Sequence, residues 1–161
     1  MIQAKRMKCV VTYFAVALSV FAHVASAEEE LPTPDLIGCL KAIEPLDVRY
    51  RGWMQQQCVG VAGDICVAID RGTGTCLSEL VGSMRAFYAE LSPLLPTTIE
   101  GSAFRVVGYA RALERAADTF ENLPECAELD GYEFTICEYI QLGVTTTELF
   151  SHARQAEISL P

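Results

Sequence analysis

LSELVGSMRAFYAEL, residues 77–91, carries apolar side chains at intervals of three and four residues. The positions are Leu77, Leu80, Val81, Met84, Phe87, Tyr88 and Leu91. On a helix of 3.6 residues per turn they form one stripe, so the segment predicts an amphipathic helix whose apolar face lies in a core.

The same spacing recurs farther along, in Val106, Tyr109, Ala110, Leu113, Ala116, Ala117 and Phe120. Charges of both signs occupy the other side of this segment, as on a solvent-facing helix surface. Thr97-x-x-Glu100 has capping-box spacing and predicts where this helix starts. Thr135-x-x-Glu138 likewise predicts the start of a final helix that runs to about Gln155. Its expected inward residues are Ile136, Tyr139, Ile140, Val144, Thr147 and Phe150.

Upstream, Pro34 suits a first helical turn and predicts a short helix that ends at Glu44, before Pro45. A second segment from Leu46 brings Tyr50, Trp53 and Met54 toward Cys58, with Trp53 expected to pack in the core. Residues 59–75 hold four glycines, which predict a loop or a broken helix. The expected fold class is all-α, an antiparallel helical bundle with short connections.

The N-terminus predicts export. Lys5, Arg6 and Lys8 precede an apolar stretch over residues 9–22, and Ala25-Ser26-Ala27 offers a small-x-small cleavage site. Residues 1–27 are therefore expected to be a secretory signal peptide, and residues 28–161 a single helical domain in the periplasm or outside the cell.

The periplasm and the outside of the cell are oxidising, so cysteines in an exported chain are expected to form disulfides. Six follow the predicted leader: Cys39, Cys58, Cys66, Cys76, Cys126 and Cys137. An even number predicts three disulfides. Cys126 and Cys137 are expected to pair across a loop, and the fold is expected to consist of two disulfide-braced helix-loop-helix hairpins. The other four cysteines allow three connectivities. None forms Cys-x-x-Cys, so no metal site and no thioredoxin-like pair is predicted.

Charge narrows the partner class. All twenty-one carboxylates follow residue 27 and three of the twelve basic residues precede it, so the exported chain has a formal charge of −12. Nucleic acid is excluded as a partner, because phosphate binding needs clustered Lys and Arg. A basic protein is better matched, and the alternative is that the acidity only keeps an exported protein soluble. No stretch after Ala27 is long and apolar enough to span a membrane.

Catalytic chemistry has little support. His152 is the one histidine after the predicted leader, and a structural role is expected for it. Asp64 with Asp70, and Asp130 with Glu133, are candidate partner contacts in two loops, with ordinary turn chemistry as the alternative. No enzyme activity and no cofactor is predicted.

The cysteine pattern resembles the LprI-like lysozyme-inhibitor family. The resemblance rests on Cys39-Leu40, on Cys58-Val59-Gly60-x-Ala62 leading to Cys66, and on Cys76-Leu77-x-Glu79 opening a helix. It continues with Phe120 before Cys126, Gly131 in the loop, and Cys137 before Thr145 and Thr146. It covers roughly residues 37–154.

The resemblance implies an exported, non-enzymatic binding protein that inhibits a cationic hydrolase such as lysozyme. The alternative hypothesis is a structural or adaptor module of the cell envelope, which would bind another envelope protein through an apolar helix face.

Overall fold

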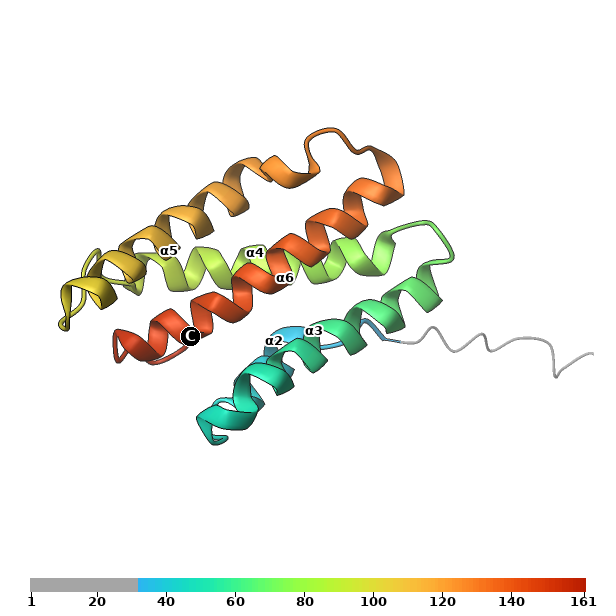
Figure 1. Cartoon of the computed structure of the whole chain (residues 1–161). Helices are drawn as coiled ribbons and strands as arrows, with labels where there is room; N and C mark the ends of the chain where they lie inside the picture. The colour runs from blue at the N-terminus through green and yellow to red at the C-terminus, as the bar shows by residue number, and fades with distance from the viewer. Residues whose placement is uncertain (1–31) are drawn as a thin grey trace, which may run out of the picture. The chain divides into compact units, whose positions relative to one another are not determined.

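The computed structural model describes residues 32–161, and within these the chain is all-α (Figure 1). The α-helices are α2 (Leu36–Ile43), α3 (Val48–Asp70), α4 (Thr75–Leu91), α5 (Ala103–Asn122) and α6 (Gly131–Gln155). Short 3-10 turns η1 (Ser92–Leu94) and η2 (Pro124–Cys126) follow α4 and α5. The predicted helical bundle is thus confirmed, whereas the predicted leader lies outside the described residues.

Helix α4 forms the centre of the core, in contact with α2, α3 and α6. Its predicted stripe is confirmed: every member is buried except Tyr88, which is half-buried. Phe87 stacks on Phe150 of α6 at a centroid distance of 4.8 Å, and Tyr88 stacks on Phe120 of α5 at 4.1 Å. The periodicity of α4 therefore fixes which faces of α5 and α6 turn inward.

Helix α3 is continuous to Asp70, so the predicted loop over residues 59–75 is wrong for most of its length. Gly63 lies inside the helix against Tyr139, where an added Cβ would stand 2.7 Å from the ring. Close helix packing thus accounts for this glycine. The chain turns only after Asp70, through Arg71, Gly72 and Gly74 with positive φ.

Both capping-box spacings gave wrong helix starts. Helix α5 begins at Ala103, where Ser102 is the N-cap and accepts a hydrogen bond from the backbone N–H of Arg105 at 3.4 Å. Helix α6 begins at Gly131, four residues before Thr135, whose hydroxyl donates to the Gly131 carbonyl at 3.3 Å. A threonine inside a helix can donate its hydroxyl hydrogen bond to a carbonyl of the preceding turn, as Thr135 does. Its capping-box spacing to Glu138 therefore does not mark the start of a helix.

The register predicted for α6 is partly wrong, although its end at Gln155 is confirmed. Tyr139 and Phe150 are buried as expected, but Ile140 is 50% and Val144 53% exposed. The buried face instead holds Leu142, Gly143, Thr145, Thr146, Leu149, Phe150 and Ala153. Gly143 explains the rotation, because it lets α6 approach Val59 of α3.

Trp53 is 60% exposed on α3, so the prediction of a core position for it is wrong. The inner face of this helix is filled by smaller groups, among them Cys58, Ala62 and Cys66. Tryptophan therefore stands on the outer side of the helix.

Three disulfides join neighbouring elements: Cys39–Cys58 links α2 to α3, Cys66–Cys76 links α3 to α4, and Cys126–Cys137 links η2 to α6. The last is the pair expected from the sequence. The first two resolve the connectivity that the sequence leaves open.

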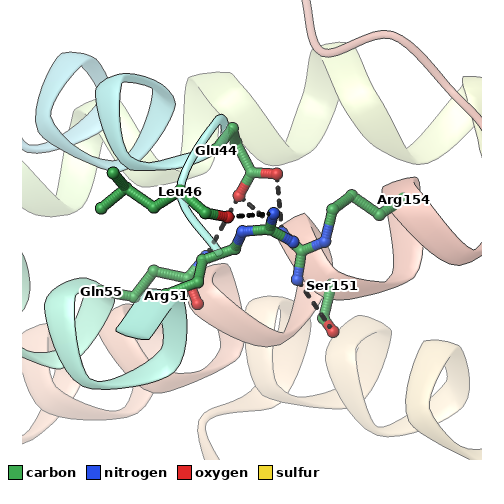
Figure 2. A network of polar contacts seen from close by, with 6 residues as sticks. All are labelled: Glu44, Leu46, Arg51, Gln55, Ser151 and Arg154. Carbon is green, nitrogen blue, oxygen red and sulfur yellow. Dashed lines mark hydrogen bonds and ion pairs between the residues drawn. The ribbon is translucent and has the colours of Figure 1, made fainter. Parts of the chain in front are cut away.

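A polar cluster ties α6 to the turn between α2 and α3 (Figure 2). Arg154 Nη1 donates to both carboxylate oxygens of Glu44, at 2.6 and 2.7 Å. Gln55 Nε2 donates to Glu44 Oε1 at 3.3 Å, and Arg51 Nη2 donates to the Leu46 carbonyl at 2.6 Å. These bonds anchor the last turns of α6 to segments about a hundred residues earlier in the chain.

Removing the Cys126–Cys137 bridge by the double change Cys126→Ala and Cys137→Ala should lower the free energy of unfolding by roughly 2.5–3 kcal/mol, because the unfolded chain regains loop freedom. Urea unfolding followed by circular dichroism measures the change. An unaltered midpoint and slope would show that the bridge adds nothing to stability.

His152 should make stability pH-dependent. Burial lowers its pKa below the ordinary value of 6.5, with the Glu148 carboxylate opposing and Arg115 adding to the shift. The unfolded chain therefore takes up this proton first, and stability falls as the pH drops below about 6.5. Unfolding curves of the wild type and of His152→Gln between about pH 7.5 and pH 5 should diverge toward the acid end. Parallel curves would contradict the assignment.

Candidate binding surface

Asp70 is a structural carboxylate. It is 4% exposed, and its Oδ1 and Oδ2 accept hydrogen bonds from the backbone N–H groups of Cys76 at 2.7 Å and Leu77 at 3.2 Å. These donors lie in the first turn of α4, where the helix itself supplies no acceptor. Asp70 thus caps α4 from the end of α3 and is not accessible to a partner.

The other predicted contacts, Asp64, Asp130 and Glu133, are exposed. Asp64 lies on α3, whereas Asp130 and Glu133 lie at the start of α6. The α3–α4 turn and the start of α6 meet at one end of the bundle, since an added Cβ on Gly74 would stand 3.4 Å from the Tyr132 ring (Figure 1). The structure thus brings the short α3–α4 turn beside the start of α6, leaves Asp64 on α3 outside that turn, and removes Asp70 from the exposed set.

Five exposed carboxylates follow one another around the α5–α6 connection. We call them the acidic turn: Glu121, Glu125, Glu128, Asp130 and Glu133. No lysine or arginine occurs between Arg115 and Arg154. None of the five takes part in an ion pair within residues 32–161. Their negative charge is therefore presented to solvent.

The acidic turn is held at both of its ends. The Cys126–Cys137 bridge crosses it. Beneath it, Arg85 of α4 donates from Nη1 to the Phe120 carbonyl at 2.6 Å and from Nη2 to Glu138 Oε1 at 2.6 Å. One guanidinium thus joins the end of α5 to the beginning of α6, and the carboxylates between them lie on a fixed frame.

An apolar hollow of about 370 Å³ adjoins the acidic turn on α6. Its lining is Leu129, Glu133, Ile136, Cys137, Ile140 and Gln141. Glu133 belongs to both features, so one carboxylate of the acidic turn borders an apolar floor that includes Ile136 and Ile140. This arrangement suits a partner that offers an apolar side chain surrounded by cationic ones.

The sequence interpretation missed the hollow because it turned Ile140, which is 50% exposed, toward the core. Ile136, which also lines the hollow, is half-buried and packs against the core as expected. The interpretation also missed Glu121, Glu125 and Glu128, although the absence of basic residues from 116 to 153 was a readable signal. Periodicity reports that a helix has an apolar stripe, but it does not report whether a neighbour covers that stripe.

Tyr139 of α6 is a buried residue that packs against α3. Burial raises the pKa of Tyr139 to about 12, and its hydroxyl donates to the Val59 carbonyl, so it acts as a packing group. Within the described residues no group of three His, Cys, Asp or Glu side chains is placed to hold a metal ion. Over the same range no helix meets the length and hydropathy needed to cross a bilayer.

Comparison of the chain with protein-family models, with curated proteins and with solved structures finds no match.

Asp70→Ala should lower the free energy of unfolding by roughly 1–3 kcal/mol, because two buried backbone donors lose their acceptor. The matched change Asp64→Ala, at an exposed position on the same helix, should stay within about 0.5 kcal/mol of the wild type. Chemical denaturation of the two variants side by side measures the difference. Equal effects would contradict the capping role.

Proposed function

We propose that this chain is an exported, non-enzymatic binding protein that binds a cationic protein through the acidic turn and the adjoining hollow. A lysozyme-like hydrolase is the first candidate partner. The observation that carries the proposal is the acidic turn itself: five exposed carboxylates that form no ion pair with any residue from 32 to 161, braced by a disulfide and by Arg85. Export to an oxidising compartment is part of the proposal.

Electrostatics supports this choice of partner. Opposite charge on two proteins raises the rate at which they meet, and a surface of one sign repels acidic competitors. A braced turn also loses little conformational entropy on binding, so more of the contact energy appears as affinity. The apolar floor of Ile136 and Ile140 offers the desolvated centre that strong interfaces use.

The lysozyme candidate comes from the resemblance of the cysteine pattern to the LprI-like family, and membership of that family belongs to the proposal. An inhibitor of this kind acts by occlusion. It needs no catalytic group, only a rigid acidic surface that covers a basic cleft.

A second candidate is an adaptor module of the cell envelope. The exposed apolar side chains on α3, which include Tyr50, Trp53 and Val61, favour it, because such faces commonly mark interaction sites. Recovery of one stable envelope partner from an extract, without any hydrolase, would support this function over inhibition.

The proposal is tested by adding the purified, oxidised protein to a lysozyme lysis assay at low and at moderate salt. The expected result is inhibition that weakens as salt rises, because screening reduces the attraction. Undiminished lysis at both salt concentrations would refute lysozyme as the partner.

Reversal of two charges in the acidic turn, Glu128→Lys with Glu133→Lys, should slow association with lysozyme by roughly tenfold or more. The matched control, Glu100→Lys with Glu114→Lys, changes the net charge equally at exposed positions outside the turn. It should have a much smaller effect. Surface-binding kinetics measures both, and equal slowing would show that only net charge matters.

A further inference from the structure

Helix α5 begins with an uncovered aromatic side chain. Phe104, its second residue, is 89% exposed, the largest fraction among the large hydrophobic side chains that the structure describes. Val107, one turn later, is 48% exposed. Ser102 already caps the helix, so neither apolar group is needed to start it. We call Phe104 and Val107, together with the flanking Arg105 and Arg111, the α5 patch.

The charge of the α5 patch is positive, unlike that of the chain as a whole. Arg105 and Arg111 are exposed, and neither forms an ion pair with another residue that the structure describes. Arg105 Nη2 donates to the Gln155 carbonyl at 3.0 Å, but this acceptor is uncharged and does not neutralise the guanidinium. From residue 91 to residue 113 the two arginines are accompanied by a single carboxylate, Glu100. The α5 patch is therefore an apolar group beside cations.

The hollow beside the acidic turn has the opposite character. Ile140, 50% exposed, forms part of its floor, and Val144, 53% exposed, lies one turn farther along α6. Glu133 borders the floor, and no lysine or arginine occurs between Arg115 and Arg154. Two apolar groups one turn apart beside negative charge thus match two apolar groups one turn apart beside positive charge.

We propose that the α5 patch of one copy of this chain docks into the hollow of a second copy, with the Phe104 ring on the floor of Ile136 and Ile140. The hollow of about 370 Å³ lies near the lower end of ligand-sized clefts, roughly 300–1,000 Å³, and has room for one aromatic ring. Arg105 and Arg111 then lie against the acidic turn, where opposite charges fix the direction of approach. The chain itself thus supplies the apolar group beside cations that the hollow requires.

This contact can form only between copies. The α5 patch and the acidic turn lie at opposite ends of α5, which is one continuous helix (Figure 1). Phe104 and Glu121 are seventeen residues apart, which is about 25 Å along a helix, so a copy cannot place its ring in its own hollow. Repeated between copies, the contact closes as a reciprocal dimer or continues as a chain or ring.

The net negative charge of the chain does not prevent the contact at physiological salt. The Debye length is then about 8 Å, much shorter than α5, so charges spread over the rest of two copies are largely screened. Charges brought together at a partly desolvated contact are screened much less. One aromatic anchor with a few charges suits a weak interface, with a dissociation constant roughly between 1 μM and 1 mM.

Self-association of this kind would regulate the binding proposed above, because both use the hollow. At high local concentration the hollow of each copy is filled by the next copy, and dilution or a basic protein frees it. The inference rests on the part of the proposed function that makes the hollow a binding surface. It does not require lysozyme to be the partner.

Sedimentation of the wild type from about 10 μM to about 2 mM protein, at about 0.15 M salt, gives the direct test. The weight-average mass should rise above that of the monomer as the concentration increases. A monomer at every concentration would overturn the proposal.

Two variants, each lacking one half of the contact, test the pairing. Phe104→Asp and Ile140→Asp change exposed positions, so neither should disturb the fold, as circular dichroism can verify. Each variant alone should have a dissociation constant for self-association raised at least about tenfold. Mixed one to one, they should form a heterodimer again, because the first keeps an intact hollow and the second an intact Phe104. Two folded variants that fail to pair in the mixture would overturn the contact.

Matched controls separate the contact from general stickiness and from net charge. Trp53→Asp changes an exposed aromatic on α3, outside both surfaces, and should associate as the wild type does. Arg111→Glu should raise the dissociation constant roughly threefold or more, whereas Lys41→Glu, the same charge change at an exposed position on α2, should have little effect. Equal losses within either pair, Trp53→Asp with Phe104→Asp or Lys41→Glu with Arg111→Glu, would refute the interface.

Phe104→Asp also separates this inference from the proposed function. It keeps the acidic turn and the hollow, so it should inhibit lysozyme at least as strongly as the wild type. Inhibition by a wild type that stays monomeric would overturn the self-association alone. Self-association without inhibition would overturn lysozyme as the partner and leave the contact between copies standing.

Discussion

The three disulfides are the constraint on which the rest of the described structure depends. Each joins elements that are neighbours along the chain, so the connections between α2, α3 and α4, and between α5 and α6, are fixed covalently. A domain of this size has a small core, and cross-links that restrict the unfolded chain compensate for it. With its turns fixed, the protein can leave apolar side chains such as Trp53 and Ile140 uncovered.

The sequence predicted the fold class and the central helix well, because α4 is covered on its whole apolar side and periodicity then reports burial directly. It failed where packing depends on a distant neighbour. Gly63 looked like a helix breaker, yet it lies within α3 because Tyr139, far along the chain, needs the space. Ile140 looked like a core residue, yet the helix is rotated so that Gly143 meets Val59.

The candidate surface was predicted only in part. Asp130 precedes α6 as expected, but Glu133 lies in the first turn of that helix and not in a loop. Asp70 is buried because α4 lacks a capping side chain of its own: Gly74 stands at its N-cap. Residue type alone could not separate these carboxylates, since a turn carboxylate that caps a helix and one that meets a partner occur in the same sequence context. Only the position of the next backbone donors distinguishes them.

The seam between α3 and α6 has a consequence for how this protein can change in length. Val59 meets Gly143, and Gly63 meets Tyr139, so two notches and two projections fit together at the same spacing on antiparallel helices. One inserted residue would rotate everything beyond it by about 100° and separate both pairs at once. Insertions and deletions should therefore be tolerated in the turns but not within these two helices. The four paired positions then keep a constant spacing, by which natural variants of the chain can be aligned.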